Sequence, residues 1–100
     1  MIKVKVDKNN KVINSITIEG HSGYSEFGSD IVCASVSSIA ITSINGILKI
    51  DEGSLKYETK DGFIKIDVLK HTKVIDLLLE NMIEHLESVS NQYDKYVKII

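Results

Sequence analysis

The feature that most limits the fold of this chain is a long segment without charge, from Ile31 to Leu48. A spanning helix needs about 20 predominantly apolar residues, and we expect this segment to fall short because polar and small residues interrupt it. These residues are Ser35, Ser37, Ser38, Thr42, Ser43, Asn45 and Gly46. Many of its other residues are isoleucine or valine, which favour strands, but the length of the segment favours a helix. We therefore predict a buried helix that starts near Ser29 or Asp30, both good N-cap residues, and ends around residues 46–48.

Two pairs of strands flank this predicted helix. Before it, apolar and charged residues alternate from Ile2 to Asp7, residues 7–10 have the chemistry of a turn, and a second strand runs from about Val12 to Glu19. After it, alternating residues at 55–59 and 63–69 enclose the turn residues Lys60-Asp61-Gly62. An Asp-Gly pair between two alternating segments is a strong signal of a hairpin.

A second helix is predicted by apolar residues at helical spacing, with Thr72 as its N-cap. These residues are Ile75, Leu78, Leu79, Met82, Leu86 and Val89. The end of the chain, from Tyr93 to Ile100, can form a last strand. The order ββαββαβ indicates one α+β domain over residues 1–100, with a mostly antiparallel sheet and two helices packed on it.

Composition limits the compartment and the partners. The net charge is −2 and the lysines are spread singly, which argues against binding of nucleic acid. The N-terminus alternates and lacks the apolar block of a signal peptide. The single cysteine, Cys33, cannot form an internal disulfide, and a free thiol fits a reducing compartment. We therefore expect a cytoplasmic protein without nucleic-acid or membrane partners.

The stretch that carries chemistry runs from Gly20 to Ser37 and reads GHSGYSEFGSDIVCASVS. If Asp30 caps the helix, Cys33 is its third residue, where unpaired backbone N–H groups and the helix dipole favour an anion. The thiolate is the reactive form of cysteine, and the same N–H groups can stabilise an oxyanion on an attacked carbonyl. Cys33 is therefore a candidate nucleophile, with a buried structural cysteine as the alternative.

A candidate base, His21, stands twelve residues before Cys33, directly after the second strand. Gly20 allows the chain to turn sharply at the end of that strand. If the loop that follows folds back, the imidazole comes within reach of the thiol, as an activated cysteine requires. Alone, His21 would be interpreted as a surface histidine, and only its pairing with Cys33 favours a catalytic role.

Two further residues can support such a pair. Asp30 can cap the helix, or it can accept a hydrogen bond from the imidazole and fix its tautomer as the third member of a triad. Ser37 follows Cys33 by four residues and so lies on the same helix face. There it can form a hydrogen bond near the site, or it can simply allow close packing.

Metal and nucleotide sites have weaker support. A zinc site formed by Cys33, His21 and Asp30 stays open, although metal motifs usually contain tighter pairs such as C-x-x-C. The other histidines, His71 and His85, have no ligand-like spacing to the cysteine. No Gly-Lys-Ser/Thr follows the glycines, so a P-loop is absent. We expect neither a metal nor another cofactor.

The strings GHSGY (residues 20–24) and GSDIVCA (residues 28–34), with the spacing between them, resemble the signature of the ribosomal-processing cysteine protease family, called Prp. Members of that family have about this length. The resemblance covers essentially the whole chain, because the predicted strands and helices and the ending YVKI (residues 96–99) follow the family's order. It implies a homodimeric α+β protein that cleaves the short N-terminal extension of a bacterial large-subunit ribosomal protein.

The same resemblance implies a role for each residue of the site. Cys33 would be the nucleophile, and His21 would be the general base and later the general acid. Two polar residues match motif positions that support the site, and two glycines would shape the loop between the catalytic groups. These supporting residues are Asp30, Ser37, Gly20 and Gly28.

Two other functions stay open. In the first, the protein is a non-catalytic, ribosome-associated peptide-binding module whose helix start binds a phosphate or carboxylate, and Cys33 is incidental. In the second, the protein is a purely structural dimer. The structural reading leaves the Gly20–His21 and Asp30–Cys33 arrangement without an explanation.

Overall fold

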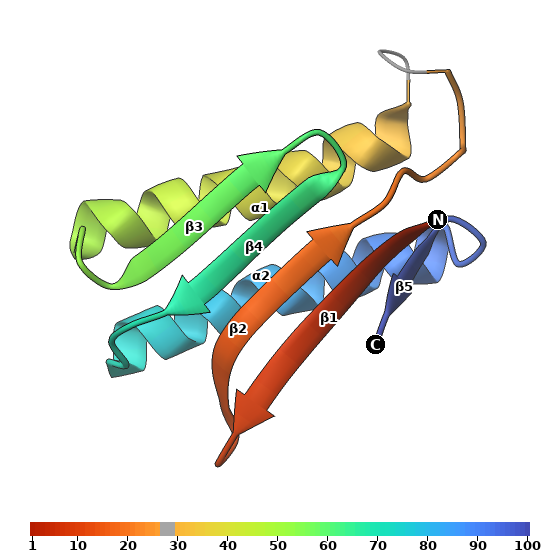
Figure 1. Cartoon of the computed structure of the whole chain (residues 1–100). Coiled ribbons are helices and arrows are strands. Elements are labelled where there is room, and N and C mark those ends of the chain that lie inside the picture. Colours follow the sequence, from red (N-terminus) through yellow and green to blue (C-terminus); the bar gives the residue numbers. More distant parts are fainter. Residues whose placement is uncertain (27–29) are drawn as a thin grey trace.

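The fold, seen in a computed structural model that describes residues 1–26 and 30–100, has the predicted ββαββαβ order (Figure 1). The elements are β1 (Ile2–Asn9), β2 (Val12–Glu19), α1 (Ile31–Ile50), β3 (Leu55–Lys60), β4 (Phe63–Val68), α2 (Lys73–Gln92) and β5 (Val97–Ile99). The five strands form one sheet in the order β3-β4-β2-β1-β5. Neighbouring strands are antiparallel except for β1 and β5, which are parallel. The predicted α+β class with a mostly antiparallel sheet is therefore confirmed.

Both helices lie on the same face of the sheet, side by side (Figure 1). The face of the sheet that they cover carries buried residues at every second position of the central strands, for example Ile16, Ile18, Ile64 and Ile66. The opposite face carries charged and polar residues such as Lys65. This alternation, typical of a sheet covered on one side only, sets which side of each strand can face a helix.

The first hairpin turns later than predicted. Strand β1 extends to Asn9, and the turn is made by Asn10 and Lys11, both with positive φ angles of 52° and 67°. Two consecutive residues with positive φ are typical of a type I′ turn, whose backbone matches the twist of the two flanking strands. Asparagine adopts positive φ more readily than most residues. The register of the ladder shifts between Asp7 and Lys8. Of the expected turn residues 7–10, the first three therefore belong to the strand, where the register shifts, and only Asn10 lies in the turn.

Helix α1 begins where predicted and ends later. Asp30 is its N-cap, with an extended backbone at φ −81° and ψ 102°. Gly46 remains helical, and the helix continues to Ile50 because Ile47 extends its buried face. The buried residues of α1 recur at helical spacing: Val32, Val36, Ala40, Ile44 and Ile47. The prediction of a core helix is confirmed, and its predicted end at residues 46–48 was too early.

The expectation that this segment is too polar to span a membrane is wrong. Helix α1 has 20 residues and contains an 18-residue window of mean hydropathy 1.8, so by length and composition alone it could cross a membrane. A core helix of a soluble protein passes the same test. Here α1 packs against the sheet and α2 through five buried residues, and 28% of that window is buried.

The second half of the chain follows its predicted pattern closely. Strands β3 and β4 differ by one residue from the predicted ends, and Gly62 in their turn has a φ of 68°. Thr72 caps α2 by accepting a hydrogen bond from the N–H of Ile75 at 3.2 Å. Strand β5 is shorter than predicted, because the chain between Tyr93 and Tyr96 forms a turn before the strand starts.

Three parts of this fold meet at one end of the sheet: the carboxyl end of β2, the β3–β4 turn and the amino end of α1 (Figure 1). The N–H of Gly20, just after β2, donates to the carbonyl of Gly62 in the β3–β4 turn at 2.9 Å. The pairing of β2 with β4 therefore brings the second hairpin next to the loop that leads to α1.

Replacement of Leu79 by alanine should lower the free energy of unfolding by about 2–5 kcal/mol, because this side chain of α2 is fully buried. The matched control is Leu77→Ala on the same helix. Leu77 is 53% exposed, and its replacement should change stability by less than about 0.5 kcal/mol. Denaturant unfolding of both variants measures the difference, and equal losses would contradict this assignment of the buried face of α2.

Candidate active site

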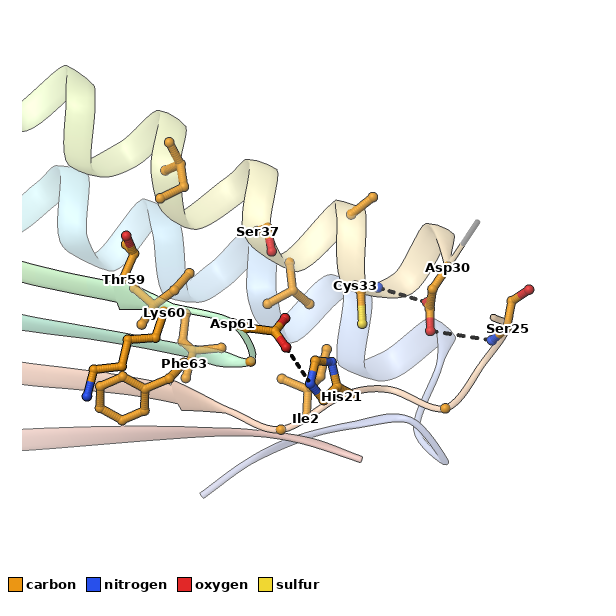
Figure 2. Close-up of a pocket in the computed structure, with 18 residues that line it drawn as sticks. Ile2, His21, Ser25, Asp30, Cys33, Ser37, Thr59, Lys60, Asp61 and Phe63 are labelled. Atoms are coloured by element: carbon orange, nitrogen blue, oxygen red, sulfur yellow. Dashed lines mark hydrogen bonds and ion pairs between the residues drawn. The ribbon is translucent and has the colours of Figure 1, made fainter. Parts of the chain in front are cut away.

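The site is organised around the carboxylate of Asp30, which is 9% exposed. Its Oδ1 accepts hydrogen bonds from the N–H groups of Val32 and Cys33, both at 3.0 Å, and so caps α1. Its Oδ2 accepts from the hydroxyl of Ser22 and from the N–H of Ser25, the latter at 3.4 Å. Figure 2 shows the contacts of Asp30 with Cys33 and Ser25. One carboxylate thus joins the start of α1 to the loop that follows β2.

These hydrogen bonds determine the charge of Asp30. Burial disfavours the charged form and by itself raises the pKa of this carboxyl group. Four hydrogen bonds to the carboxylate lower the pKa by more, from 3.8 to about 2. Their donors are the hydroxyl of Ser22 and the N–H groups of Cys33, Ser25 and Val32. Asp30 is therefore a stable anion at neutral pH although it is buried.

Ser22 connects this carboxylate to the sulfur of Cys33. The side chain of Ser22 is buried, and its backbone N–H donates to Cys33 Sγ at 3.4 Å. Cys33 itself is half-buried and has a free thiol. A backbone donor aimed at sulfur stabilises negative charge on it. The residue directly after His21 is therefore in contact with the candidate nucleophile.

The expected oxyanion hole at the helix start is not supported. The N–H groups of Val32 and Cys33 donate to the Asp30 side chain, and that of Ala34 donates to the Asp30 carbonyl at 3.0 Å. These groups are therefore already used by the cap and the first helical turn. Among the described residues, the group that donates to the sulfur is the backbone N–H of Ser22, in the loop after β2.

The loop is also attached to the end of the chain. The N–H of Tyr24 donates to Ser22 Oγ at 3.1 Å. The ring of Tyr24 packs edge-on against the rings of Tyr93 and Tyr96, with centroids 5.5 and 5.2 Å apart. Edge-to-face contacts of this kind are favourable. They fix the segment after Ser22 on the turn that precedes β5.

The imidazole of His21 lies against the β3–β4 turn. Its Nε2 is 3.8 Å from Oδ2 of Asp61, and the two side chains are 57% and 78% exposed (Figure 2). The ring also packs closely on Gly62, where an added Cβ would lie 2.8 Å from Nε2. Asp61, and not Asp30, is the carboxylate beside the imidazole. The capping role of Asp30 is present, and its alternative role as partner of His21 is not seen.

The backbone at His21 is held by close contacts. Gly20 has a φ of 103°, and a Cβ there would collide with the carbonyl oxygen of Met1. The terminal amino group of Met1 donates to the carbonyl of His21. A residue with a side chain would fit neither the angle nor the space at position 20. The expected role of Gly20 in shaping this turn is consistent with this geometry.

His21 and Cys33 line one cavity of about 690 Å³ between α1 and the β3–β4 turn (Figure 2). Asp30, Ser37 and Gly20 line it as well, so the structure brings these five predicted site residues together. The sixth predicted residue, Gly28, lies outside the described residues. Within the described ranges no three His, Cys, Asp or Glu side chains are grouped closely enough to hold a metal ion, so the zinc site is not assembled there.

Sequence reasoning missed three residues of the site, namely Ser22, Asp61 and Gly62. Ser22 lies inside the GHSGY string, but nothing local indicates that its N–H meets the sulfur eleven residues later. Asp61 and Gly62 were predicted correctly as a hairpin turn. Their position beside His21 depends on the pairing of Glu19 with Phe63, a contact between distant strands that no local pattern reveals.

The low pKa of Asp30 predicts how stability depends on pH. A carboxyl group whose pKa falls from 3.8 to about 2 on folding stabilises the protein fully above pH 4. This stabilisation, about 2 kcal/mol, is lost as the pH falls from 4 towards 2. The free-energy difference between wild type and Asp30→Asn, measured by denaturant unfolding, should therefore shrink by about that amount over this range. A difference that stays constant with pH would contradict the low pKa.

Gly62→Ala should displace the imidazole of His21, because the new Cβ would occupy space next to Nε2. Gly23→Ala is the matched control: Gly23 also has a positive φ, 73°, but an added Cβ there meets nothing within 4 Å. Both variants should lose about 1–2 kcal/mol of stability from backbone strain. Only Gly62→Ala should move the side-chain NMR resonances of His21 strongly, and equal changes in the two variants would contradict this packing.

Comparison with known proteins gives the family. A family model described as "Cysteine protease Prp" matches residues 1–98. The ribosomal processing cysteine protease Prp of Staphylococcus aureus is 25% identical over 103 residues, which cover 99% of this chain and 97% of the relative. The Prp of Bacillus subtilis is 26% identical over 100 residues, covering 89% of this chain and 86% of the relative.

A solved structure agrees with this match. The crystal structure of Prp from S. aureus with a covalently linked product peptide superposes on this chain with a TM-score of 0.93, at 24% sequence identity. The match covers 99% of this chain and 97% of the S. aureus chain. The signature around His21 and Cys33, the ββαββαβ fold and the match over nearly the full length agree with one another. The chain belongs to the Prp family of ribosomal processing cysteine proteases.

Proposed function

We propose that this protein is an endopeptidase that removes the N-terminal extension of a bacterial large-subunit ribosomal protein, with Cys33 as nucleophile and His21 as general base. The observation that carries this proposal is the 3.4 Å contact between the N–H of Ser22, the residue directly after His21, and Cys33 Sγ. His21 and Cys33 line the same cavity. A sulfur with a backbone donor and an imidazole that lines the same cavity are groups that nucleophilic catalysis by cysteine uses.

The proposed reaction has two steps. In the first, His21 takes the proton of the Cys33 thiol, the sulfur attacks the carbonyl carbon of the scissile peptide bond, and His21 gives the proton to the departing amine. The acyl group is then bound to sulfur as a thioester. In the second, His21 takes a proton from water, and the resulting hydroxide attacks the thioester and displaces the thiolate. His21 then returns its proton to the Cys33 sulfur, and the acid product loses its own proton to solvent and leaves as a carboxylate. The Ser22 N–H stabilises the sulfur when it carries negative charge.

Asp30, Ser22 and Asp61 have positioning roles in this proposal. Asp30 holds the hydroxyl of Ser22 and thereby the loop whose N–H meets the sulfur. Asp61 stands beside the imidazole at 3.8 Å and favours the orientation in which Nε2 faces the turn. Ser37 lies one helical turn after Cys33 on the cavity wall, where it can contact the bound peptide.

The relatives support the choice of substrate. The S. aureus and B. subtilis proteins are ribosomal processing proteases by name, and the S. aureus structure carries a covalently linked product peptide. A peptide linked covalently to the enzyme is the kind of species that a cysteine nucleophile forms. We further propose that this chain works in the cytoplasm, where the reducing environment keeps the free thiol of Cys33 from being oxidised. We also propose a homodimer, as the resemblance to the family implies.

The alternative of a non-catalytic binding module has less support from the geometry. It requires the start of α1 to bind a phosphate or carboxylate through free N–H groups. The N–H groups of Val32 and Cys33 already bind the Asp30 carboxylate, which also places a negative charge where the anion would have to sit. The helix start thus holds its own anion.

The test is the cleavage of a synthetic peptide that spans the extension of the host's ribosomal protein and the first residues of the mature chain. Wild type should cut it at one site, seen by mass spectrometry. Cys33→Ala and His21→Ala should each lower kcat by at least about 1,000-fold. His85→Ala is the matched control, because His85 is an exposed histidine of α2 that does not line the cavity, and it should cut as wild type does.

Two results would count against the proposal. Cleavage that persists in the folded Cys33→Ala variant would exclude this nucleophile. No cleavage by folded, reduced wild type would instead favour the binding module, in which case the same peptide should bind without being cut.

A further inference from the structure

The cavity continues along α1 beyond the proposed catalytic residues. Cys33, Ser37 and Ile41 are spaced by four residues, so they lie along one face of the helix, and all three line the cavity. Figure 2 shows Cys33 and Ser37 following one another along α1, with Thr59 on the hairpin across from the helix. The cavity is therefore a groove between α1 and the β3–β4 hairpin.

The far end of this groove is apolar. Thr59 pairs with Ile64, and Ile64 pairs with Ile18, so these three side chains point to the same face of the sheet, the one that α1 covers. All three line the cavity together with Ile41. We call the part of the groove formed by Ile41, Thr59 and Ile64 the Ile41 subsite.

Lys60, next to Thr59, also lines the cavity, but its charge is partly balanced by a neighbouring carboxylate. Its ammonium group pairs with Glu58 at 3.0 Å and lies 5.6 Å from the centre of the Phe63 ring. The ionisable side chains Asp30, His21 and Asp61 line the part of the groove that holds Cys33. The groove thus changes from polar near Cys33 to apolar near Ile41.

The exposed apolar surface of Ile41 favours an apolar group as the ligand of this subsite. Ile41 is 36% exposed, and covering its surface by an apolar group is favourable. Exposure alone does not distinguish it, because Ile31 and Ile50 on the same helix are 52% and 56% exposed. Only Ile41 of these three lines the cavity that holds Cys33.

We propose that the Ile41 subsite binds an apolar side chain of the substrate peptide three or four residues from the cleaved bond, and that Ile41 is a specificity-determining residue. This inference rests on the proposed function. Ile41 lies eight positions after Cys33 on the helix, a rise of about 12 Å. An extended peptide rises about 3.3 Å per residue, so the side chain that reaches Ile41 belongs to a residue three or four positions away.

The experiment uses a set of peptides in which each residue within five positions of the cleaved bond, on either side, is replaced in turn by alanine. For wild type, loss of the apolar residue three or four positions away should lower kcat/KM about tenfold, mostly through KM. Ile41→Ser should cut the parent peptide about tenfold less efficiently. The Ile41→Ser variant should also cut the parent peptide and that alanine peptide equally well, because the contact between residue 41 and the apolar side chain is already lost.

Ile50→Ser is the matched control, since it makes the same change on the same helix at a residue outside the cavity. It should keep the wild-type preference. If Ile41→Ser keeps the full preference for the apolar residue, the subsite is disproved while the protease function stands.

A second measurement separates the two proposals. Binding of the parent and alanine peptides to Cys33→Ala, with and without Ile41→Ser, reports the subsite without any cleavage. Failure of wild type to cut, together with binding that depends on Ile41, would overturn the protease function and keep the subsite. Peptide binding that is absent or insensitive to Ile41→Ser would overturn the subsite.

Discussion

The buried carboxylate of Asp30 is the interaction on which the rest of the site depends. A buried anion without partners would be strongly destabilising, and here four hydrogen bonds from two segments surround it. Two of them come from the first turn of α1 and two from the loop after β2. The same contacts that keep the charge stable therefore hold the loop against the helix. The position of Ser22, and with it the donor to Cys33, follows from that attachment.

This arrangement changes what the helix start contributes to chemistry. The amino end of a helix can stabilise an anion near it, and in this protein the first anion there is the cap itself. Within the described residues, the Cys33 sulfur accepts a hydrogen bond from the loop instead, from the N–H of Ser22. The hydrogen bonding of the Cys33 sulfur thus depends on the position of the loop, and a change in the loop would alter the sulfur's environment without altering the helix.

Local signals predicted the parts of the molecule that depend on near neighbours in sequence. Asp30 as cap and Cys33 in the first turn are separated by three residues, and the stripe of α2 repeats within a few residues, so both could be predicted. The place of Asp61 beside His21 could not, because it results from the pairing of β2 with β4. The expectation that the α1 segment is too polar to cross a membrane was wrong for a related reason. Helix α1 packs the core with one row of residues and lines the groove with the next, and neither row contains a charged residue.

The aromatic contacts of Tyr24 have a consequence for the order in which the site can form. Tyr24 belongs to the loop that carries Ser22, and its ring partners, Tyr93 and Tyr96, are among the last residues of the chain. The final strand also pairs with the first one, β1. During synthesis these contacts can form only after residues 93–99 have been made. A nascent chain that already contains Cys33 and His21 but not these residues still lacks the support that fixes their loop.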